Sequence, residues 1–156
     1  MQDFAAQHPS FWAAGFPIYF VALWLGVSFL ISLAGGWWGL SKQYRTERTF
    51  PAHKKSFQRG QMRGTTAYNG VLTLGSDAEG VYLGVMFLFR CAHPPLFIPW
   101  SDVEVEAPTR YFFLRVQKLR LGPNRILLML REPLAEFLLA ERPESKAQAS
   151  GIRWGI

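Results

Sequence analysis

Residues 16–40, FPIYFVALWLGVSFLISLAGGWWGL, decide the architecture of this 156-residue chain, because the whole run contains no charged residue. A helix of this length, at about 1.5 Å rise per residue, is about 37 Å long and exceeds the roughly 30 Å hydrocarbon core of a bilayer. Aromatic residues flank the run, with Trp12 and Tyr19 toward its start and Trp37 and Trp38 at its end, as in the aromatic belts of membrane proteins. The pattern predicts one transmembrane helix.

A cleaved signal peptide is the alternative interpretation of this run, and the small residues Ser32 and Ala34 would suit a cleavage site. Signal peptides begin with a basic segment and carry an apolar stretch of about 7–15 residues. Residues 1–15 contain no Lys or Arg, and the apolar run here is longer than that. The sequence therefore favours a retained helix preceded by a short, weakly structured extracytoplasmic segment at residues 1–15.

Basic residues are distributed unevenly, because all 17 Lys and Arg follow Leu40. A basic collar directly after the helix, in which Glu47 is the only acid, comprises Lys42, Arg45, Arg48, Lys54, Lys55, Arg59 and Arg63. By the positive-inside rule the N-terminus lies outside and the C-terminal domain is cytoplasmic, and a single cysteine agrees with that compartment. The collar either only sets this topology or also binds anionic lipid headgroups. The nearly neutral remainder disfavours nucleic acid as a partner.

Small residues recur within the predicted helix at spacings that bring them to one face. Ser28, Ser32 and Gly36 are four residues apart, as are Gly35 and Gly39. Small residues at this spacing allow a second helix to approach closely. The stripe therefore predicts packing against a helix partner, although Gly and Ser at such positions also occur by chance.

The rest of the chain predicts β-structure. Residues 41–55 are a basic juxtamembrane linker, in which Pro51 would end any helix that continued from the membrane. Apolar and polar residues then alternate in segments separated by turn residues, which predicts strands over residues 56–63, 67–74, 80–90, 96–106, 110–121 and 126–130. A short amphipathic helix follows at residues 133–140 with Pro at its first turn, and residues 142–156 form a polar tail. Residues 56–141 would bury this pattern as a curled antiparallel sheet, a partly open barrel capped by the C-terminal helix.

Residues 89–106, FRCAHPPLFIPWSDVEVE, concentrate the residue types used in catalysis and metal binding. Cys91 and His93 have C-x-H spacing, but two ligands are fewer than a zinc site requires. Ser101 and Asp102 have no nucleophile elbow or oxyanion turn beside them. We therefore expect no metal, no cofactor and no enzyme activity, and an enzyme that uses the loop from Cys91 to Asp102 is the alternative.

The structural interpretation of the same segment makes specific predictions. His93 would lie on the surface of a loop and Cys91 would be fairly buried. The side-chain oxygens of Ser101 and Asp102 would bind nearby backbone N–H groups.

The order of these elements resembles the pleckstrin-homology-like superfold, as found in the GRAM and bacterial pleckstrin-homology groups. The resemblance lies in LFIPWSDVEVEA followed by two strands, ILLML and LAEFLLA. Its signature positions are Pro95, Ile98, Pro99, Trp100, Asp102 and Val103. The stretch GVYLGVMFLFRCAHPPLFIPWSDV, with GW at 36–37 and YR at 44–45, also resembles a block in uncharacterised bacterial single-pass membrane proteins that carry a β-rich cytoplasmic domain.

Together these observations predict a non-enzymatic, single-pass protein of the bacterial inner (plasma) membrane. The resemblance implies a cytoplasmic domain that contacts a protein partner or anionic lipid headgroups, as an adaptor or as an accessory subunit of a membrane complex. Leu96, Ile98 and Trp100 are expected to pack in or against the core. The exposed rim of the preceding loop, residues 93–95, is where a partner or headgroup is expected to dock.

Overall fold

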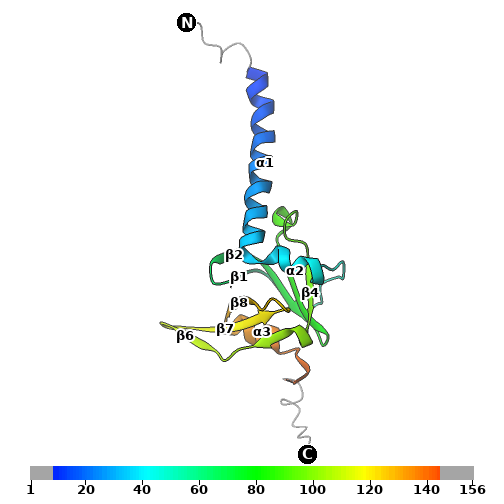
Figure 1. The fold of residues 1–156 in the computed structure, drawn as a ribbon, viewed down its shortest axis with the longest axis vertical. Coiled ribbons are helices and arrows are strands. Elements are labelled where there is room, and N and C mark those ends of the chain that lie inside the picture. The colour runs from blue at the N-terminus through cyan, green and yellow to red at the C-terminus, as the bar shows by residue number, and fades with distance from the viewer. Residues whose placement is uncertain (1–8, 145–156) are drawn as a thin grey trace, which may run out of the picture.

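The computed structural model of the chain describes residues 9–144, with side-chain surroundings described from residue 15. Helix α1 (Pro9–Gly35) projects from one end of a β domain (Figure 1). Within the part of the chain that the structure describes, the stretch Gly15–Gly35, 21 residues long, is the one helix long and apolar enough to cross a membrane. Most of its large apolar side chains point away from the rest of the molecule. Their contact with water would be unfavourable, which fits an apolar surrounding medium.

The apolar run forms two helices, so the predicted single helix over residues 16–40 does not continue to residue 40. α1 begins at Pro9 and ends at Gly35, and α2 (Trp37–Tyr44) leaves in a new direction. Gly36 joins them with a φ of 79°, in the left-handed region that glycine adopts without steric cost. The inner face of α2 is buried in the domain, and Trp37 has no exposed surface. Because of this break, the last residues of the apolar run belong to α2, which packs against the domain.

The predicted boundaries on either side of the helix change accordingly. Residues 9–15, expected to be weakly structured, are helical, and residues 1–8 lie outside the described residues. Residues 41–44 of the predicted linker belong to α2. Arg45 then forms a β-bridge with Leu96, and the chain continues along the domain surface. Helix α1 therefore reaches the β domain through a packed helix and not through a free linker.

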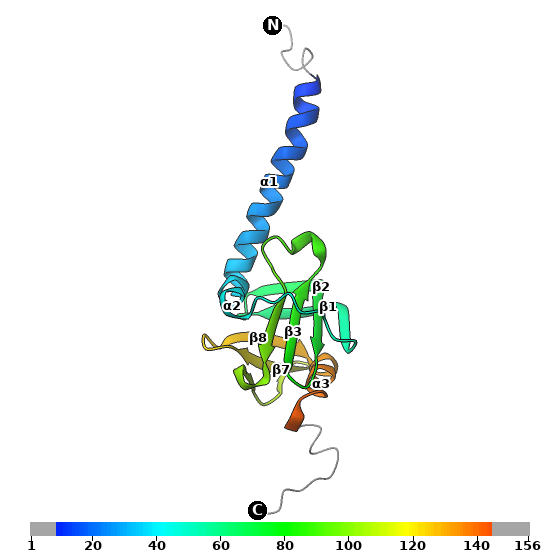
Figure 2. The same cartoon turned by 90° about the vertical axis from the view of Figure 1, so that its right-hand side faces the viewer.

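Within residues 9–144, eight antiparallel strands form one curled sheet. They are β1 (Lys54–Met62), β2 (Thr66–Ser76), β3 (Gly80–Val85), β4 (Leu96–Pro99), β5 (Val103–Val105), β6 (Thr109–Tyr111), β7 (Leu114–Leu121) and β8 (Ile126–Arg131). Their order is β4-β3-β2-β1-β8-β7-β5, and β6 pairs with β7. A 3₁₀ turn (Trp100–Asp102) carries the chain from β4 to β5, which lie at the two ends of this order. The sheet is thereby nearly closed into a barrel (Figure 2).

Helix α3 (Glu132–Leu139) covers the end of the barrel that lies away from α1 (Figures 1 and 2). Its buried residues Leu134, Ala135 and Leu138 face the sheet, as expected for a short amphipathic helix. The predicted architecture is therefore confirmed at the level of one apolar N-terminal helix, a mainly antiparallel sheet and a C-terminal helix. The predicted tail from residue 145 onward lies outside the described residues.

Three predicted strands are shorter or divided in the structure, because the strand pairing stops or changes partway along each of them. The predicted strand at residues 80–90 ends at Val85, and a 3₁₀ turn (Phe87–Phe89) follows. The predicted strand at residues 96–106 is divided between β4 and β5, which pair with β3 and β7 respectively. The predicted strand at residues 110–121 is a hairpin of β6 and β7. Local alternation describes an extended chain, but only the tertiary fold decides where a neighbouring strand is present.

The core confirms the expected packing of the segment that the resemblance singled out. Leu96 and Ile98 are fully buried, and Val103 is nearly so. Trp100 is half-buried against the core, and its indole Nε1–H donates to the Asp77 carbonyl at 2.8 Å. This segment is therefore architectural along most of its length.

Candidate functional site

Trp37, the first residue of α2, packs this helix against the β domain. Its indole Nε1–H donates to the Pro94 carbonyl at 2.9 Å. Its ring centroid lies 5.2 Å from that of His93 and 5.9 Å from that of Tyr68. Both partners belong to the β domain, so these contacts fix α2 against that domain.

His93 is buried, with 1% of its surface exposed, and Cys91 is exposed, so both predicted positions are reversed. The Nδ1 of His93 lies 3.2 Å from the Phe89 carbonyl, which can only accept, so Nδ1 carries the proton. The Nε2 atom then accepts the hydroxyl of Tyr68 at 3.1 Å. Burial lowers the pKa of His93, against a smaller opposite effect of the bond to Phe89, and burial raises the pKa of Tyr68. The pair is therefore neutral at physiological pH.

Acidification below about pH 6.5, the ordinary pKa of histidine, is expected to destabilise the domain. The folded state holds the His93 pKa below that value, so the unfolded state binds the proton more readily and stability falls as pH drops through this window. The free energy of urea unfolding, measured between pH 5 and 8 on the full chain in detergent, checks this. His93→Gln should flatten the slope below pH 6.5. If the stability of His93→Gln falls with pH as steeply as that of the wild type, protonation of His93 is not the cause.

Residues 86–95, here called the α1-side loop, rise beside the domain end of α1 (Figures 1 and 2). Trp24 of α1 donates its Nε1–H to the Leu88 carbonyl at 3.3 Å, and its ring lies 5.0 Å from that of Phe89. Phe87 is 70% exposed and Leu88 is 47% exposed. The expected exposure of the rim at residues 93–95 is wrong, because His93 is buried and the exposed residues of this loop, Phe87, Leu88, Arg90 and Cys91, come earlier.

A cavity of about 200 Å³ lies behind the α1-side loop. It is bordered by Ile31 of α1, by Ala67, Tyr68, Asn69 and Val71 of β2, and by Val85, Phe89 and His93. Apart from Asn69 and the hydrogen-bonded tyrosine and histidine, these residues are apolar. The space can hold a small apolar group and offers no catalytic arrangement.

The predicted helix-packing stripe faces this chain's own domain. Its members are Ser28, Ser32, Gly35, Gly36 and Gly39. The two serines are buried, and a Cβ atom on Gly35 would lie 2.7 Å from the Tyr68 hydroxyl. A Cβ atom on Gly36 would lie 2.8 Å from the Cδ1 atom of Ile126, whereas Gly39 is less crowded. The small residues thus have an intramolecular use, and packing against a second helix stays a prediction.

The basic collar divides into two groups. Near the base of α1, Lys42 belongs to α2 and Arg45 pairs with the first residue of β4. The Nε atom of Arg63 lies 2.9 Å from where a Cβ on Gly36 would be. These three side chains surround the junction between the helix and the domain.

The other four collar residues lie elsewhere on the domain. Arg48 forms an ion pair with Glu79 at 2.7 Å. Lys54 is the first residue of β1 and lies opposite Gly75 of β2. The Lys55 Nζ lies 4.3 Å from the ring centroid of Phe137 in α3, at the end of the barrel away from α1. Arg59 lines surface hollows described below. The sequence grouped these residues by their position in the chain, but the fold separates them.

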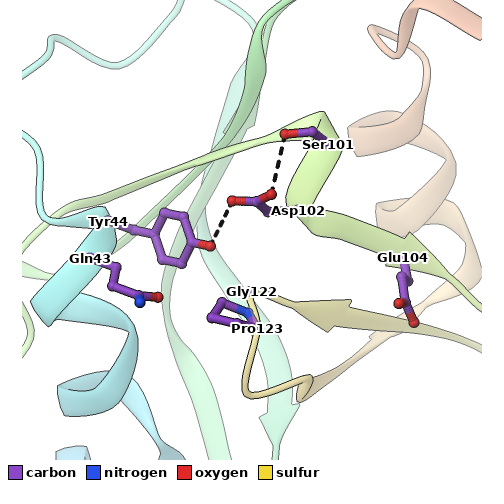
Figure 3. A pocket seen from close by; sticks show the side chains of 7 residues that line it. All are labelled: Gln43, Tyr44, Ser101, Asp102, Glu104, Gly122 and Pro123. Atoms are coloured by element: carbon purple, nitrogen blue, oxygen red, sulfur yellow. Dashed lines mark hydrogen bonds between the residues drawn. The ribbon is translucent and has the colours of Figure 1, made fainter.

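Asp102 forms hydrogen bonds that connect the turn after β4 with α2 and with the turn between β7 and β8. It lies at the edge of a surface hollow of about 530 Å³ (Figure 3). Its carboxylate accepts the hydroxyl of Tyr44 at 2.7 Å and that of Ser101 at 3.2 Å. Its carbonyl accepts the backbone N–H of Gly122 at 2.9 Å. The predicted bonds from these side-chain oxygens to backbone N–H groups are thus replaced by bonds between side chains. Burial, together with Asp102, raises the pKa of Tyr44 to about 12.

The residues considered for catalysis are not brought together. His93 binds Tyr68 and Phe89 at the α1 side of the domain, whereas Ser101 and Asp102 follow β4. The four residues of β4 lie between these two groups and extend about 13 Å. Among the described residues no three His, Cys, Asp or Glu side chains gather as metal ligands would. The geometry therefore offers no support for the alternative of an enzyme at this loop.

The hairpin between β6 and β7 carries a feature that the sequence reasoning missed. Tyr111 pairs with Leu114, so Phe112 and Phe113 form a two-residue turn and are 93% and 96% exposed. Phe112 has a φ of 51°, a left-handed conformation that costs a bulky residue about 1–2 kcal/mol. A turn selected for folding alone would carry Gly, Asn or Asp there. The run RYFFL, three aromatics without a turn residue, was the available signal.

A groove begins at Tyr111 and Leu114, the pair that flanks this aromatic tip, and extends across the domain surface. β1 and β8 pair only at Gln61↔Met129 and Met62↔Leu128, so the two strands diverge beyond these pairs. Two adjoining hollows, of about 520 and 360 Å³, lie along this divergence, and Arg59 and Arg131 line both.

We call this surface the β1–β8 groove and define it by Phe57, Arg59, Arg131, Tyr111 and Leu114. Phe57, at one end, is exposed and also has a positive φ, of 58°. Within residues 9–144 neither guanidinium of the groove forms an ion pair with a carboxylate. The groove thus has exposed aromatic rings at its two ends and two arginines between them.

Comparisons of the chain with protein-family models, with curated proteins and with solved structures find no match.

Proposed function

We propose that this chain is a non-enzymatic, single-pass protein of the bacterial inner membrane that binds a protein partner through the β1–β8 groove. It acts as an adaptor or accessory subunit, with the N-terminus outside and the pleckstrin-homology-like domain in the cytoplasm. The observation that carries the proposal is the pair of almost fully exposed phenylalanines at the tip of the β6–β7 hairpin.

The membrane part of the proposal is supported by the apolar stretch Gly15–Gly35 and by the charges at its base. Lys42, Arg45 and Arg63 would lie at the level of the cytoplasmic headgroups. Each basic residue near an anionic surface contributes on the order of 1 kcal/mol. They would hold the domain against the bilayer, in addition to setting the topology.

The groove has the chemistry of a protein-binding surface. Aromatic residues and arginine are enriched among the residues that dominate binding energy at protein interfaces. An exposed aromatic residue in a strained backbone conformation is costly for the free chain, which favours a role in binding. Because no ion pair within residues 9–144 occupies Arg59 or Arg131, the complementary partner surface would combine apolar and acidic side chains.

Replacing Phe112 with Asn is expected to stabilise the fold and to weaken binding of the partner. Asn tolerates left-handed backbone, so the free energy of unfolding should rise by up to about 1 kcal/mol. Partner capture should fall at least tenfold. Capture is measured with a photo-crosslinking amino acid at position 113 of the full chain in native membranes, and the adduct is identified by mass spectrometry.

The matched control carries the crosslinker at Ala78, an exposed position in the turn between β2 and β3. It should give no adduct of the same mass. Reversing the charge of Arg59 and Arg131 together should weaken the position-113 adduct as strongly as Phe112→Asn does. An adduct only with a second copy of this chain, or with lipid, would refute a separate protein partner.

A further inference from the structure

We infer that the tip of the α1-side loop, residues 86–91, is inserted into the hydrocarbon of the bilayer leaflet beside α1, where Phe87 and Leu88 contact lipid acyl chains. The inference rests on the proposed role of α1 as a membrane span. It assigns to this loop a lipid-binding role, distinct from the groove that would bind a protein.

The depth of the loop follows from its contact with Trp24. This residue lies one position before the middle of the stretch Gly15–Gly35, and 11 residues, about 16 Å, before its end. The hydrocarbon half-thickness of a bilayer is about 15 Å. The Leu88 carbonyl is 3.3 Å from the Trp24 indole nitrogen. Even when the length of the indole side chain is subtracted, the loop tip lies on the hydrocarbon side of Gly35.

The carbonyl groups of the loop backbone are satisfied within the protein. This matters because unpaired backbone polar groups are costly in hydrocarbon, where irregular backbone needs protein around it. Four N–H groups in and directly after the tip donate to carbonyls three residues earlier: Phe89 to Met86, Arg90 to Phe87, Ala92 to Phe89 and His93 to Arg90. The remaining carbonyl, that of Leu88, accepts the Trp24 indole. Every carbonyl from residue 86 to residue 90 therefore has a donor.

The side chains of the tip continue the lipid-facing surface of α1. Phe87 and Leu88 are exposed beside a helix whose own exposed residues are apolar, and both views show the loop rising along that helix (Figures 1 and 2). Arg90 is exposed, and its long side chain can extend toward the headgroups while its stem stays in apolar surroundings. Continuity with the apolar helix identifies acyl chains as the occupant.

Environment-sensitive labels on the full chain test the inference. Single cysteines are introduced in a Cys91→Ser background at Val21 in α1, at Phe87 in the loop and at Phe113 in the hairpin tip. Each variant is labelled with a nitrobenzoxadiazole fluorophore and reconstituted into phosphatidylcholine–phosphatidylglycerol vesicles, with iodide on both sides in one series. Quenching by iodide and quenching by nitroxides on the lipid acyl chains are then compared.

Labels at Val21 and Phe87 should be quenched at least threefold more by the acyl-chain nitroxides than the label at Phe113, which iodide should quench instead. If the Phe87 label follows the Phe113 label while Val21 remains lipid-quenched, α1 spans the bilayer and the insertion of the loop is refuted. If the Val21 label is also quenched by iodide and not by lipid, the membrane span itself is refuted. Shielding of the Phe87 label from both quenchers would mean that protein covers the loop, and would overturn the inference.

Discussion

Replacing Trp37 with alanine is expected to lower the free energy of unfolding of the β domain by about 3–5 kcal/mol, the usual cost of removing a buried aromatic side chain. The indole is fully buried, and it bridges α2 to the His93 and Tyr68 rings. Its loss also leaves the Pro94 carbonyl without its donor. Urea unfolding of the full chain in detergent, followed by near-ultraviolet circular dichroism, measures the change.

The adjacent tryptophan provides a matched control for this prediction. Trp38 is 41% exposed and makes an edge-on contact with Phe29 of α1. Trp38→Ala should therefore cost less than about 1 kcal/mol, as surface substitutions usually do. Trp37→Phe should fall between the two, because it retains a ring but not the indole donor. Equal costs for Trp37→Ala and Trp38→Ala would show that the junction is not held by the buried indole.

Gly36→Ala is expected to cost about 2–3 kcal/mol, from two sources. A side chain in the left-handed region costs about 1–2 kcal/mol, and crowding in a packed site costs a further 1 kcal/mol or more. The added methyl would meet the Cδ1 atom of Ile126 at 2.8 Å, and that residue is itself buried. The same unfolding measurement applies, and near-ultraviolet circular dichroism of the folded state reports the packing of the tryptophans.

Gly39→Ala is the control, in the same GGWWG segment. Gly39 lies inside α2 without a positive φ, and an added Cβ would have its nearest neighbour at an ordinary 3.8 Å. Alanine there should raise stability by about 0.5–1 kcal/mol, because it is the better helix former. If Gly36→Ala is as harmless as Gly39→Ala, the break between α1 and α2 does not depend on glycine.

The sequence was sufficient to predict the helix, the antiparallel strands and the helix at the end of the domain, because these depend on local hydrophobic pattern. It was insufficient wherever two residues of similar chemistry have different tertiary surroundings. Trp37 and Trp38 both fit an aromatic belt, yet the turn at Gly36 directs one into the core and leaves the other half-exposed. The paired glycines at 35 and 36 were the local signal for that turn.

The candidate sites were predicted less well than the fold, for a related reason. Cys91 and His93 exchange their expected positions because the 3₁₀ turn before them rotates the loop, so His93 points inward to Tyr68. The basic collar is continuous in the chain but not in space. The groove depends on where β1 separates from β8, and the register of paired strands distant in sequence fixes that point.

The fixed joint at Gly36 has a mechanical consequence. Transmembrane helices tilt when the thickness of the surrounding bilayer differs from their apolar length. α2 is packed into the barrel, and α1 itself contacts the domain through Ser28, Ser32 and Trp24. In the proposed membrane-spanning arrangement, a tilt of α1 would therefore also rotate the barrel and change the height of the aromatic hairpin above the bilayer plane.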